Sequence, residues 1–353
     1  SLCAMKASFC SYDLNFKTPG GTSRGILKIK ESYFICIKEG RNFGIGEVGL
    51  LRGLSMDDVP HFEDQIKWTC NHIHLGLDEL YLANKQFPSI QFALEQAFSH
   101  LVHGFNHFPS SFTAGRDCLK INGLIWMGNV DFMREQVAKR LSEGFKTLKM
   151  KVGSVAWEEE KSILCALREQ FGPEDLELRV DANGAFSLKQ AVEISRCLEE
   201  IQVHSIEQPL KAGENLDLAK AAKQMHIPIA LDESLIGVVN SVDKEKLLDV
   251  VEPQYIILKP SFVGGWKGSD EWVKLAEERN IGWWATSALE STVGLNAIAQ
   301  WAFSKNNNVP QGLGTGSLYN NNIAGPFKVE NGQLNVNGDI QEGWDLSPIK
   351  SIL

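Results

Sequence analysis

A short apolar strand that contains two lysines is the feature that most constrains this chain. Residues 147–153 read Thr-Leu-Lys-Met-Lys-Val-Gly, so Lys149 and Lys151 are two positions apart. Alternate side chains of a β-strand share a face, and both ammonium groups therefore point the same way. Later apolar segments also end in charged residues, namely Asp181, Glu207, Asp232 and Lys259. Charges repeated at strand ends indicate one shared site rather than a solvated surface.

The spacing of these charges predicts a parallel barrel. From Lys151 onward they follow one another at steps of 30, 26, 25 and 27 residues, with amphipathic segments between them. Short apolar strands covered on both faces explain the pattern. We expect strands near residues 121–126, 146–152, 176–181, 203–207, 228–232, 254–259, 281–286 and 311–313. An eight-stranded (β/α) barrel follows, with its chemistry at the C-terminal strand ends; a doubly wound open sheet is the alternative.

The rest of the chain predicts a smaller domain. Residues 7–50 contain four strand-like segments joined by glycine-rich turns, 7–16, 23–30, 33–38 and 43–48, which indicates an antiparallel meander. Residues 57–107 have a helical pattern. We therefore expect an α+β domain over residues 1–112, the barrel over 113–325, and a C-terminal segment, 326–353, that returns to the first domain.

Composition limits the class of partner. The formal net charge is −9 and no Lys/Arg-rich run is present, which argues against nucleic acid or an acidic membrane surface and leaves small molecules. No apolar stretch approaches the roughly 20 residues of a membrane span, and no basic-then-apolar signal pattern opens the sequence. The seven cysteines are scattered. We therefore expect no disulfide framework and no structural zinc, and a cytoplasmic protein.

Two further motifs offer alternative sites. Residues 44–49 match G-x-G-x-x-G, the pattern of a dinucleotide-binding turn, although neither a convincing helix nor a βαβ unit is expected around it. His100, His103 and His107 share one helical face and could bind a metal ion. No carboxylate accompanies them, and surface histidines are the simpler interpretation.

Asp181, Glu207 and Asp232 end three successive predicted strands, so their carboxylates converge in a closed barrel. Three oxygen donors without a thiolate or imidazole suit a hard cation. We predict Mg²⁺, with Mn²⁺ also possible. Each acid taken singly could instead be a helix N-cap or a surface residue. Glu233 follows Asp232 and points the other way on strand geometry, which favours a supporting role.

Lys149, Lys151 and Lys259 would face this metal. A partly desolvated lysine beside another cation has a lowered pKa, so its neutral amine can accept a proton near neutral pH. We predict Lys151 as the base and Lys259 as the group that stabilises negative charge from the other face. The lysines could instead merely pair with the carboxylates.

A metal between lysines on opposite walls suits removal of a proton from the carbon next to a carboxylate. Covalent hydrolysis is disfavoured, because no nucleophile is arranged with a histidine.

These residues resemble the enolase superfamily, and within it the muconate-lactonizing branch. That branch has Lys-x-Lys on the second barrel strand, then Asp, Glu and Asp on the next three, then Lys on the sixth. The matching segments here are Lys149-Met-Lys151, Asp181-Ala-Asn183, Glu207-Gln-Pro209, Asp232-Glu-Ser234 and Lys259-Pro260. The resemblance implies Mg²⁺-dependent proton abstraction, with Asn183 and Glu233 behind the site. It also implies that the first domain and the tail form a capping domain whose loop, Thr18 to Gly25, closes over the substrate.

The segment after the eighth strand separates the reactions of that branch. Dipeptide epimerases have Asp-x-Asp there, whereas residues 312–319 read Gly-Leu-Gly-Thr-Gly-Ser-Leu-Tyr and offer no partner to an ammonium group. Arg179 and residues 286–292 resemble the o-succinylbenzoate synthases. The substrate-binding residues that we predict are Arg179, Thr286, Ser287, Gly312 and Gly314.

We therefore expect dehydration of 2-succinyl-6-hydroxy-2,4-cyclohexadiene-1-carboxylate to o-succinylbenzoate, a step of menaquinone biosynthesis. Racemisation of N-acylamino acids, dipeptide epimerisation and cycloisomerisation stay open as alternatives within the superfamily. A catalytically inert barrel that binds a metal and a carboxylate is an alternative of a different class. Three lysines argue against it, because binding alone needs no base.

Overall fold

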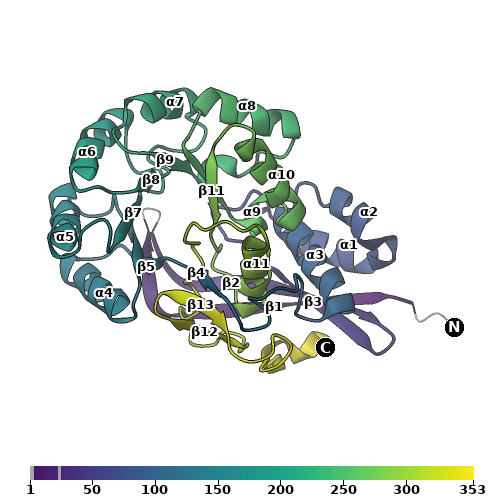
Figure 1. Cartoon of the computed structure of the whole chain (residues 1–353). Coiled ribbons are helices and arrows are strands. Elements are labelled where there is room, and N and C mark those ends of the chain that lie inside the picture. The colour runs from purple at the N-terminus through teal and green to yellow at the C-terminus, as the bar shows by residue number, and fades with distance from the viewer. Residues whose placement is uncertain (1–3, 23–24) are drawn as a thin grey trace.

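A computed structural model describes residues 4–22 and 25–353. Figure 1 shows a curled ring of strands surrounded by helices, with an N-terminal sheet and helices beside it. Within the described residues the ring is a seven-stranded parallel sheet in the order β11-β10-β9-β8-β7-β6-β5. Its strands are β5 (Gly123–Ile125), β6 (Thr147–Lys151), β7 (Glu177–Asp181), β8 (Ser205–Glu207), β9 (Ile229–Leu231), β10 (Tyr255–Leu258) and β11 (Gly282–Ala285). The predicted barrel is confirmed, and the open doubly wound sheet is wrong.

At the eighth position of the barrel, residues 311–312 pair with their neighbours through isolated β-bridges instead of forming a full strand. Gln311 forms a parallel bridge with Ile121, and Gly312 forms one with Thr286. The Gly312 N–H donates to the Ala285 carbonyl at 2.7 Å. Residues 311–312 therefore close the ring between β11 and the segment that precedes β5, where the sequence predicted the eighth strand.

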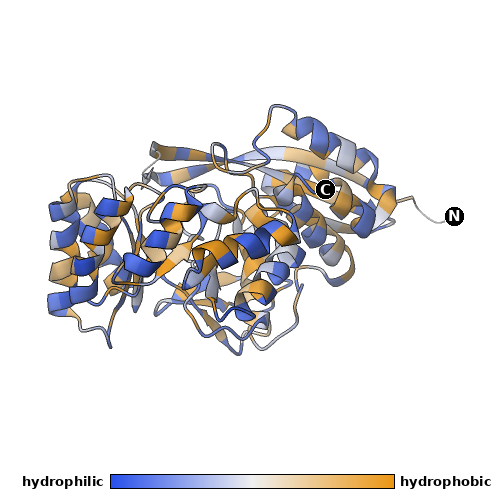
Figure 2. Cartoon of the chain, turned by 90° about the horizontal axis from the view of Figure 1, so that it is seen from above, coloured by the Kyte–Doolittle hydropathy of each residue, from blue (hydrophilic) through white to orange (hydrophobic). Residues whose placement is uncertain are grey.

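The outer helices bury their apolar residues. They are α4 (Val130–Ser142), α5 (Trp157–Gln170), α6 (Leu188–Glu200), α7 (Asn215–Gln224), α8 (Ser241–Val251), α9 (Pro260–Val263), α10 (Gly265–Glu277) and α11 (Thr292–Ser304). Of these helices, α4, α6 and α11 also begin at side-chain caps. Before α6, Ser187 and Gln190 form a capping box, in which each side chain bonds the other residue's backbone N–H. Figure 2 shows hydrophilic and hydrophobic residues mixed along these helices. Their apolar residues pack on the barrel strands, from Met133 of α4 to Trp301 of α11.

The N-terminal sheet has three strands in the described residues, β1 (Lys6–Thr22), β2 (Gly25–Glu39) and β3 (Asn42–Val48). The sequence predicted four, and the separation of 23–30 from 33–38 was wrong. Glu31 and Ser32 look like a polar turn, but they stay paired with Asp13 and Tyr12 of β1. Ser23 and Arg24, which belong to the predicted loop from Thr18 to Gly25, lie outside the described residues.

Close packing explains the glycine motif of residues 44–49. α1 (Phe62–Asn71), η1 (Ile73–Leu75), α2 (Gly76–Ala83) and α3 (Pro88–His103) follow the sheet. A Cβ at Gly44 or Gly46 would overlap the backbone of α3, at the carbonyl oxygens of Ala97 and Ala93 respectively. β3 is antiparallel to β2 and starts no βαβ unit. The dinucleotide alternative is therefore wrong.

The three histidines do not share one helical face, because α3 ends at His103 and His107 lies beyond it. His100 is buried rather than on the surface, and both His100 and His107 have structural partners. The Ile45 N–H donates to His100 Nδ1 at 3.3 Å, and His107 Nδ1 bonds Ser99 Oγ at 2.8 Å. In the described part of the chain, no three His, Cys, Asp or Glu side chains form a group that could hold a metal ion. These histidines are therefore not grouped as a metal site.

The C-terminal tail contacts both parts of the molecule. β12 (Phe327–Glu330) pairs with β13 (Gln333–Val336), and β13 pairs antiparallel with β4 (Cys118–Lys120) beside the barrel. The last turn, η3 (Ser347–Ile352), packs Ile349 and Ile352 against Phe34 and Cys36 of β2. The tail thus returns to the N-terminal sheet, and it adds no further β/α unit.

None of the helices in residues 4–22 and 25–353 combines the length and apolar character needed to cross a membrane. The described cysteines are all free thiols, as the scattered pattern predicted: Cys10, Cys36, Cys70, Cys118, Cys165 and Cys197.

Candidate active site

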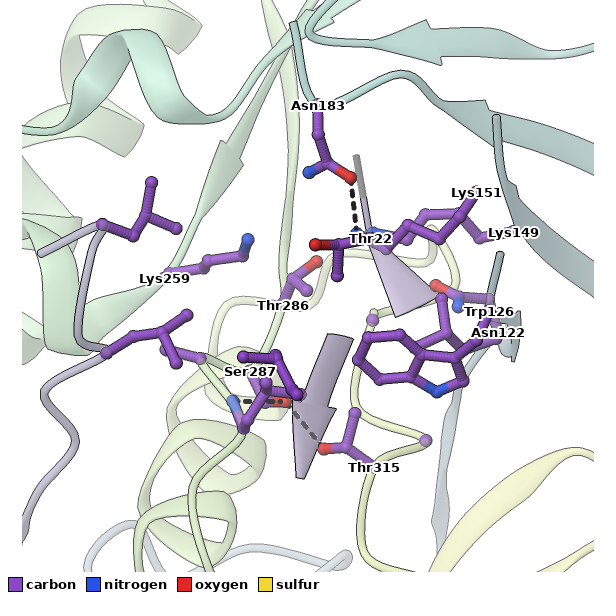
Figure 3. A pocket seen from close by; sticks show the side chains of 18 residues that line it. Thr22, Asn122, Trp126, Lys149, Lys151, Asn183, Lys259, Thr286, Ser287 and Thr315 are labelled. Carbon is purple, nitrogen blue, oxygen red and sulfur yellow. Dashed lines mark hydrogen bonds between the residues drawn. The ribbon is translucent and has the colours of Figure 1, made fainter. Parts of the chain in front are cut away.

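A pocket lies at the mouth of the barrel, between the C-terminal strand ends and the N-terminal sheet. Lys149, Lys151 and Lys259 line it, together with Asn183 after β7. Figure 3 shows Lys149 and Lys151 reaching in from one wall and Lys259 from the opposite wall. The barrel therefore brings together the three lysines that the sequence singled out.

Lys149 and Lys151 are paired with carboxylates behind them. Lys149 Nζ lies 3.0 Å from Glu207 Oε2 and 3.4 Å from Asp181 Oδ2. Lys151 Nζ lies 2.7 Å from the same Asp181 oxygen. The charges of these lysines lower the pKa of Asp181 below its ordinary range, although burial acts to raise it. Asp181 is therefore held as a carboxylate between two lysine side chains.

Lys259 forms the corresponding pair on the opposite wall, with Nζ 2.5 Å from Asp232 Oδ2. Burial acts to lower the pKa of Lys259, but the charges of Asp232, Glu207 and Glu233 outweigh burial and raise it. Burial also acts to lower the pKa of Lys149, and its carboxylate neighbours again raise it. The predicted fall in lysine pKa requires a cation beside the lysine, whereas the charges that dominate around Lys149 and Lys259 here are those of carboxylates, so the fall stays a prediction.

The three predicted metal ligands are buried behind the lysines. Asp181, Glu207 and Asp232 are at most 2% exposed, and Asp181 is the register partner of Glu207 on the adjacent strand. Burial, followed by the charge of Asp181, raises the pKa of Glu207 to about 8, although Lys149 and Lys259 act to lower it. A carboxylate so placed gains from a cation close to it.

The three acids do not form a ready-made metal group in this structure, because each is turned toward a lysine. The donor set still fits a hard cation. It consists of carboxylate oxygens from successive strand ends, the ligands that Mg²⁺ takes in proteins. Oε1 of Glu207 is buried and has no hydrogen-bond partner among the described residues. That oxygen is free to bind a cation without losing another contact.

Asn183 forms hydrogen bonds to both Lys151 and the buried side chain of Glu233. Asn183 has a left-handed backbone with φ of 44°, which asparagine tolerates better than most residues. Its Oδ1 accepts a hydrogen bond from Lys151 Nζ at 3.1 Å, and its Nδ2 donates to Glu233 Oε1 at 2.8 Å. Glu233 is 7% exposed. We propose that Asn183 and Glu233 orient Lys151.

Hydroxyl groups and glycines form the wall after β11. Thr286, Ser287, Gly312, Gly314 and Thr315 all line the pocket. Ser287 Oγ lies 2.7 Å from Thr315 Oγ1, whereas Thr286 Oγ1 is buried and has no partner in the described chain. The structure thus places four of the five predicted substrate-binding residues at the pocket, and it adds Thr315.

Gly312 keeps this wall open. A Cβ built at Gly312 would overlap Thr286 Oγ1 and lie 2.9 Å from the Cβ and Cγ2 atoms of Thr286. Thr286 is branched and buried, so it has little room to move. We expect Gly312→Ala to destabilise the protein by about 1–3 kcal/mol, measured by urea unfolding. Gly316→Ala is the control, since its nearest contact would be Leu295 Cδ2 at an ordinary 3.4 Å. Equal stability of the two variants would contradict this prediction, because it would mean that Thr286 moves aside for the added methyl group at little cost.

Arg179 does not line the pocket, which corrects its predicted role in substrate binding. Its Nε lies 2.8 Å from Glu177 Oε1, its Nη1 donates to the Pro310 carbonyl at 2.9 Å, and its guanidinium lies 4.3 Å from the centre of the Trp284 ring. Arg179 shares the inward face with Asp181 but lies two residues earlier on β7. It therefore belongs to the layer below the site.

The sequence did not single out one further wall of the pocket. Asn122, Leu124 and Trp126 come from β5 and its flanks, and Lys151 Nζ lies 6.0 Å from the centre of the Trp126 ring. These three residues are two positions apart, as Lys149 and Lys151 are, and this spacing could have shown from the sequence that they share one face of a strand. Leucines from the N-terminal domain complete the wall, and no local pattern identified them: Leu27, Leu51 and Leu54.

Comparisons with known proteins match most of the chain. The family model described as "Enolase C-terminal domain-like" matches residues 132–344. The o-succinylbenzoate synthase of Desulfotalea psychrophila is 38% identical, over 95% of this chain and 100% of that protein. The crystal structure of MenC from the same organism has a TM-score of 0.83 at 36% identity, covering 94% of this chain and 99% of that one.

A more distant structure shares the fold. The dipeptide epimerase of Enterococcus faecalis, crystallised with Mg and the dipeptide L-Leu-L-Tyr, has a TM-score of 0.84 at 20% identity. The match covers 97% of this chain and 99% of the epimerase chain. The same architecture thus occurs in proteins of different activity, so the residues of the pocket must distinguish between reactions.

Proposed function

Because the chain belongs to the enolase superfamily and is an o-succinylbenzoate synthase-like enzyme, a lyase, we propose that it dehydrates 2-succinyl-6-hydroxy-2,4-cyclohexadiene-1-carboxylate. The product would be o-succinylbenzoate, for menaquinone biosynthesis. The observation that supports this most is the placement of lysines on opposite walls of one pocket, with Lys151 facing Lys259. A base and a cation on either side of a carbon acid are what abstraction next to a carboxylate requires.

The proposed reaction uses Lys151 twice. Its neutral amine removes the proton from the ring carbon that bears the carboxylate, and the electron pair moves onto the carboxylate oxygens. The ammonium of Lys259 stabilises that charge from the other face. The bond from the neighbouring carbon to its hydroxyl group then breaks, and Lys151 returns the proton, so water leaves and the ring becomes aromatic. One acid–base residue suffices because proton and hydroxide leave from the same side.

Asp181, Glu207 and Asp232 are the residues that we propose to hold Mg²⁺. When bound, the ion would act as a Lewis acid on the substrate carboxylate. Lys149 lies between Glu207 and Asp181, and we propose that its charge offsets the repulsion between the two carboxylates and favours their ionised forms. Its position behind Lys151 on the same strand face suits this part better than proton transfer.

The chemistry of the pocket favours an anionic substrate without an amine. Its lining, over the described residues, contains three lysines and neither Asp nor Glu, so a substrate ammonium group would be buried without a counter-charge. Thr286 Oγ1 and Asn122 Oδ1 are buried and have no hydrogen-bond partner among the described residues. An oxygen of the succinyl arm would accept a hydrogen bond from the Thr286 hydroxyl, whereas Asn122 Oδ1 is itself an acceptor and would need a donor such as the ring hydroxyl group of the substrate. This argues against a dipeptide.

The decisive measurement is a comparison of substrates at one Mg²⁺ concentration. We expect kcat/KM for the cyclohexadiene to exceed that for every dipeptide and every N-succinylamino acid in a panel. The N-succinylamino acids test the assignment more strictly than the dipeptides do. Their racemisation also needs Lys151 and Lys259 on opposite faces, and it needs no acid to bind an amine. A value for any amino-acid substrate equal to that for the cyclohexadiene would refute the synthase assignment and leave the proton abstraction in place.

A further inference from the structure

Three charged side chains are buried where the N-terminal sheet meets the barrel, outside the proposed catalytic machinery. Lys30 of β2 is 2% exposed, and both Glu47 of β3 and Glu290, after β11, are fully buried. Burial lowers the pKa of Lys30, and the charges of Glu290 and Glu47 offset this fall only in part. The three residues thus form one charge cluster that joins two parts of the chain far apart in sequence.

Glu47 binds the start of a barrel helix from the N-terminal sheet. Its Oε2 accepts the Ser291 N–H at 2.8 Å, and its Oε1 accepts the Gly294 N–H at 2.9 Å and the Ser291 hydroxyl. Ser291 is the N-cap of α11. A carboxylate at this position pairs with unsatisfied N–H groups and with the positive end of the helix dipole. Glu47 therefore fixes the point where the loop of residues 286–291 enters α11.

Lys30 and Glu290 fix the middle of the same loop. Lys30 Nζ donates to the Ala288 carbonyl at 2.8 Å, and the Ala288 N–H donates to Glu290 Oε2 at 2.7 Å. Ser261, after β10, donates its hydroxyl to Glu290 Oε1 at 2.8 Å. Both polar groups of the Ala288 backbone are thus bound by buried charges.

The loop is strained and faces the substrate pocket. Leu289 has a left-handed backbone with φ of 66°, which costs a branched aliphatic residue free energy unless its surroundings impose it. Ser287, Ala288 and Leu289 all line the pocket. A loop of this shape needs external contacts to stay in place.

We propose that Lys30, with Glu47 and Glu290, positions the 286–291 loop so that the pocket takes its substrate-binding shape only when the N-terminal sheet is docked on the barrel. A simple interface would not need these charges, because buried charged groups can often be replaced by apolar residues of similar size without loss of stability. The charges instead select one loop conformation, since each bonds a particular backbone atom. Lys30, Glu47 and Glu290 are positioning residues, and none of them touches the reacting atoms.

Hydrogen exchange of the loop tests this directly. In Lys30→Met we expect amides of residues 288–291 to exchange about tenfold faster or more, because the Ala288 carbonyl loses a charged donor. Lys244→Met is the matched control. Lys244 is 3% exposed and lies 2.6 Å from Glu271 Oε2, away from this pocket. Its substitution should leave the loop unchanged. If Lys30→Met does not fold, Glu290→Gln, which keeps the side-chain volume, should give the same local change.

The kinetic test rests on the proposed function. In Lys30→Met, KM for the cyclohexadiene should rise about tenfold while kcat changes less than about threefold, because the loop contacts substrate rather than the reacting carbon. Unchanged exchange in residues 288–291, or exchange raised equally in β8 and β9, would overturn the positioning role. Failure of the wild type to turn over the cyclohexadiene would refute the proposed function, and the exchange result would still decide the inference.

Discussion

Replacing Lys151 with alanine is expected to lower kcat for the cyclohexadiene by about 10³-fold or more. Lys151 Nζ reaches the pocket and is held by Asp181 and Asn183, at 2.7 Å and 3.1 Å. Neither partner can replace its amine, since Asp181 is completely buried. Steady-state kinetics at saturating substrate would measure the loss, and circular dichroism would show that folding is little changed.

Solvent exchange separates the two lysines. In deuterated buffer, wild-type protein should exchange the α-proton of bound substrate with solvent, and Lys151→Ala should not. We expect Lys259→Ala also to lose most turnover, because Lys259 supplies the cation on the opposite wall. Exchange that persists in Lys151→Ala but is lost in Lys259→Ala would reverse their roles. Exchange at the wild-type rate in both variants would exclude both lysines as the base.

Removal of the metal should have a comparably large effect. We expect the wild type to bind about one Mg²⁺ or Mn²⁺ per chain, and to lose nearly all activity on chelation and regain it when the ion is returned. Glu207→Gln should bind the ion at least about tenfold more weakly, because it replaces an anionic ligand by a neutral one. Calorimetric titration measures both affinities without relying on turnover.

The control for this substitution is another carboxylate of the barrel. Glu177 starts β7, the strand that Asp181 ends, and it pairs with Arg179 at the other end of the barrel. Glu177→Gln should therefore leave metal affinity unchanged. Equal affinity in the wild type and in Glu207→Gln would remove Glu207 from the metal site and leave its unpartnered oxygen without a role.

Local patterns predicted the barrel strands well, and the errors arose where polar residues stay paired. Each predicted barrel strand from 146–152 to 281–286 contains the observed strand within one or two residues of its ends. In the N-terminal sheet, Glu31 and Ser32 suggested a turn, yet β2 continues through them. Ser32 is buried and its hydroxyl faces Glu47. A tertiary partner thus satisfies a side chain that would otherwise favour a turn.

The sequence alone determined which side chains share a face, because the period of a strand is a local property. Lys149 and Lys151 had to point together, and the regular spacing of the strand-end charges had to bring Asp181, Glu207, Asp232 and Lys259 to one rim. Family resemblance extended this to the predicted chemistry. Those inferences needed only the covalent order of residues and the geometry of a β/α repeat.

Only the tertiary structure decided how deep each side chain lies in the barrel, which groups it contacts and how the neighbouring charges shift its pKa. Arg179 shares a face with Asp181 but lies a layer below it, beside Trp284, and no periodicity distinguishes those depths. The pKa values of Lys149 and Lys259 are raised by carboxylates from other strands. Lys30 and Glu47 bond a loop about 250 residues away in the chain. Electrostatic and hydrogen-bond energies depend on distances of a few ångströms, and folding alone sets such distances between segments remote in sequence.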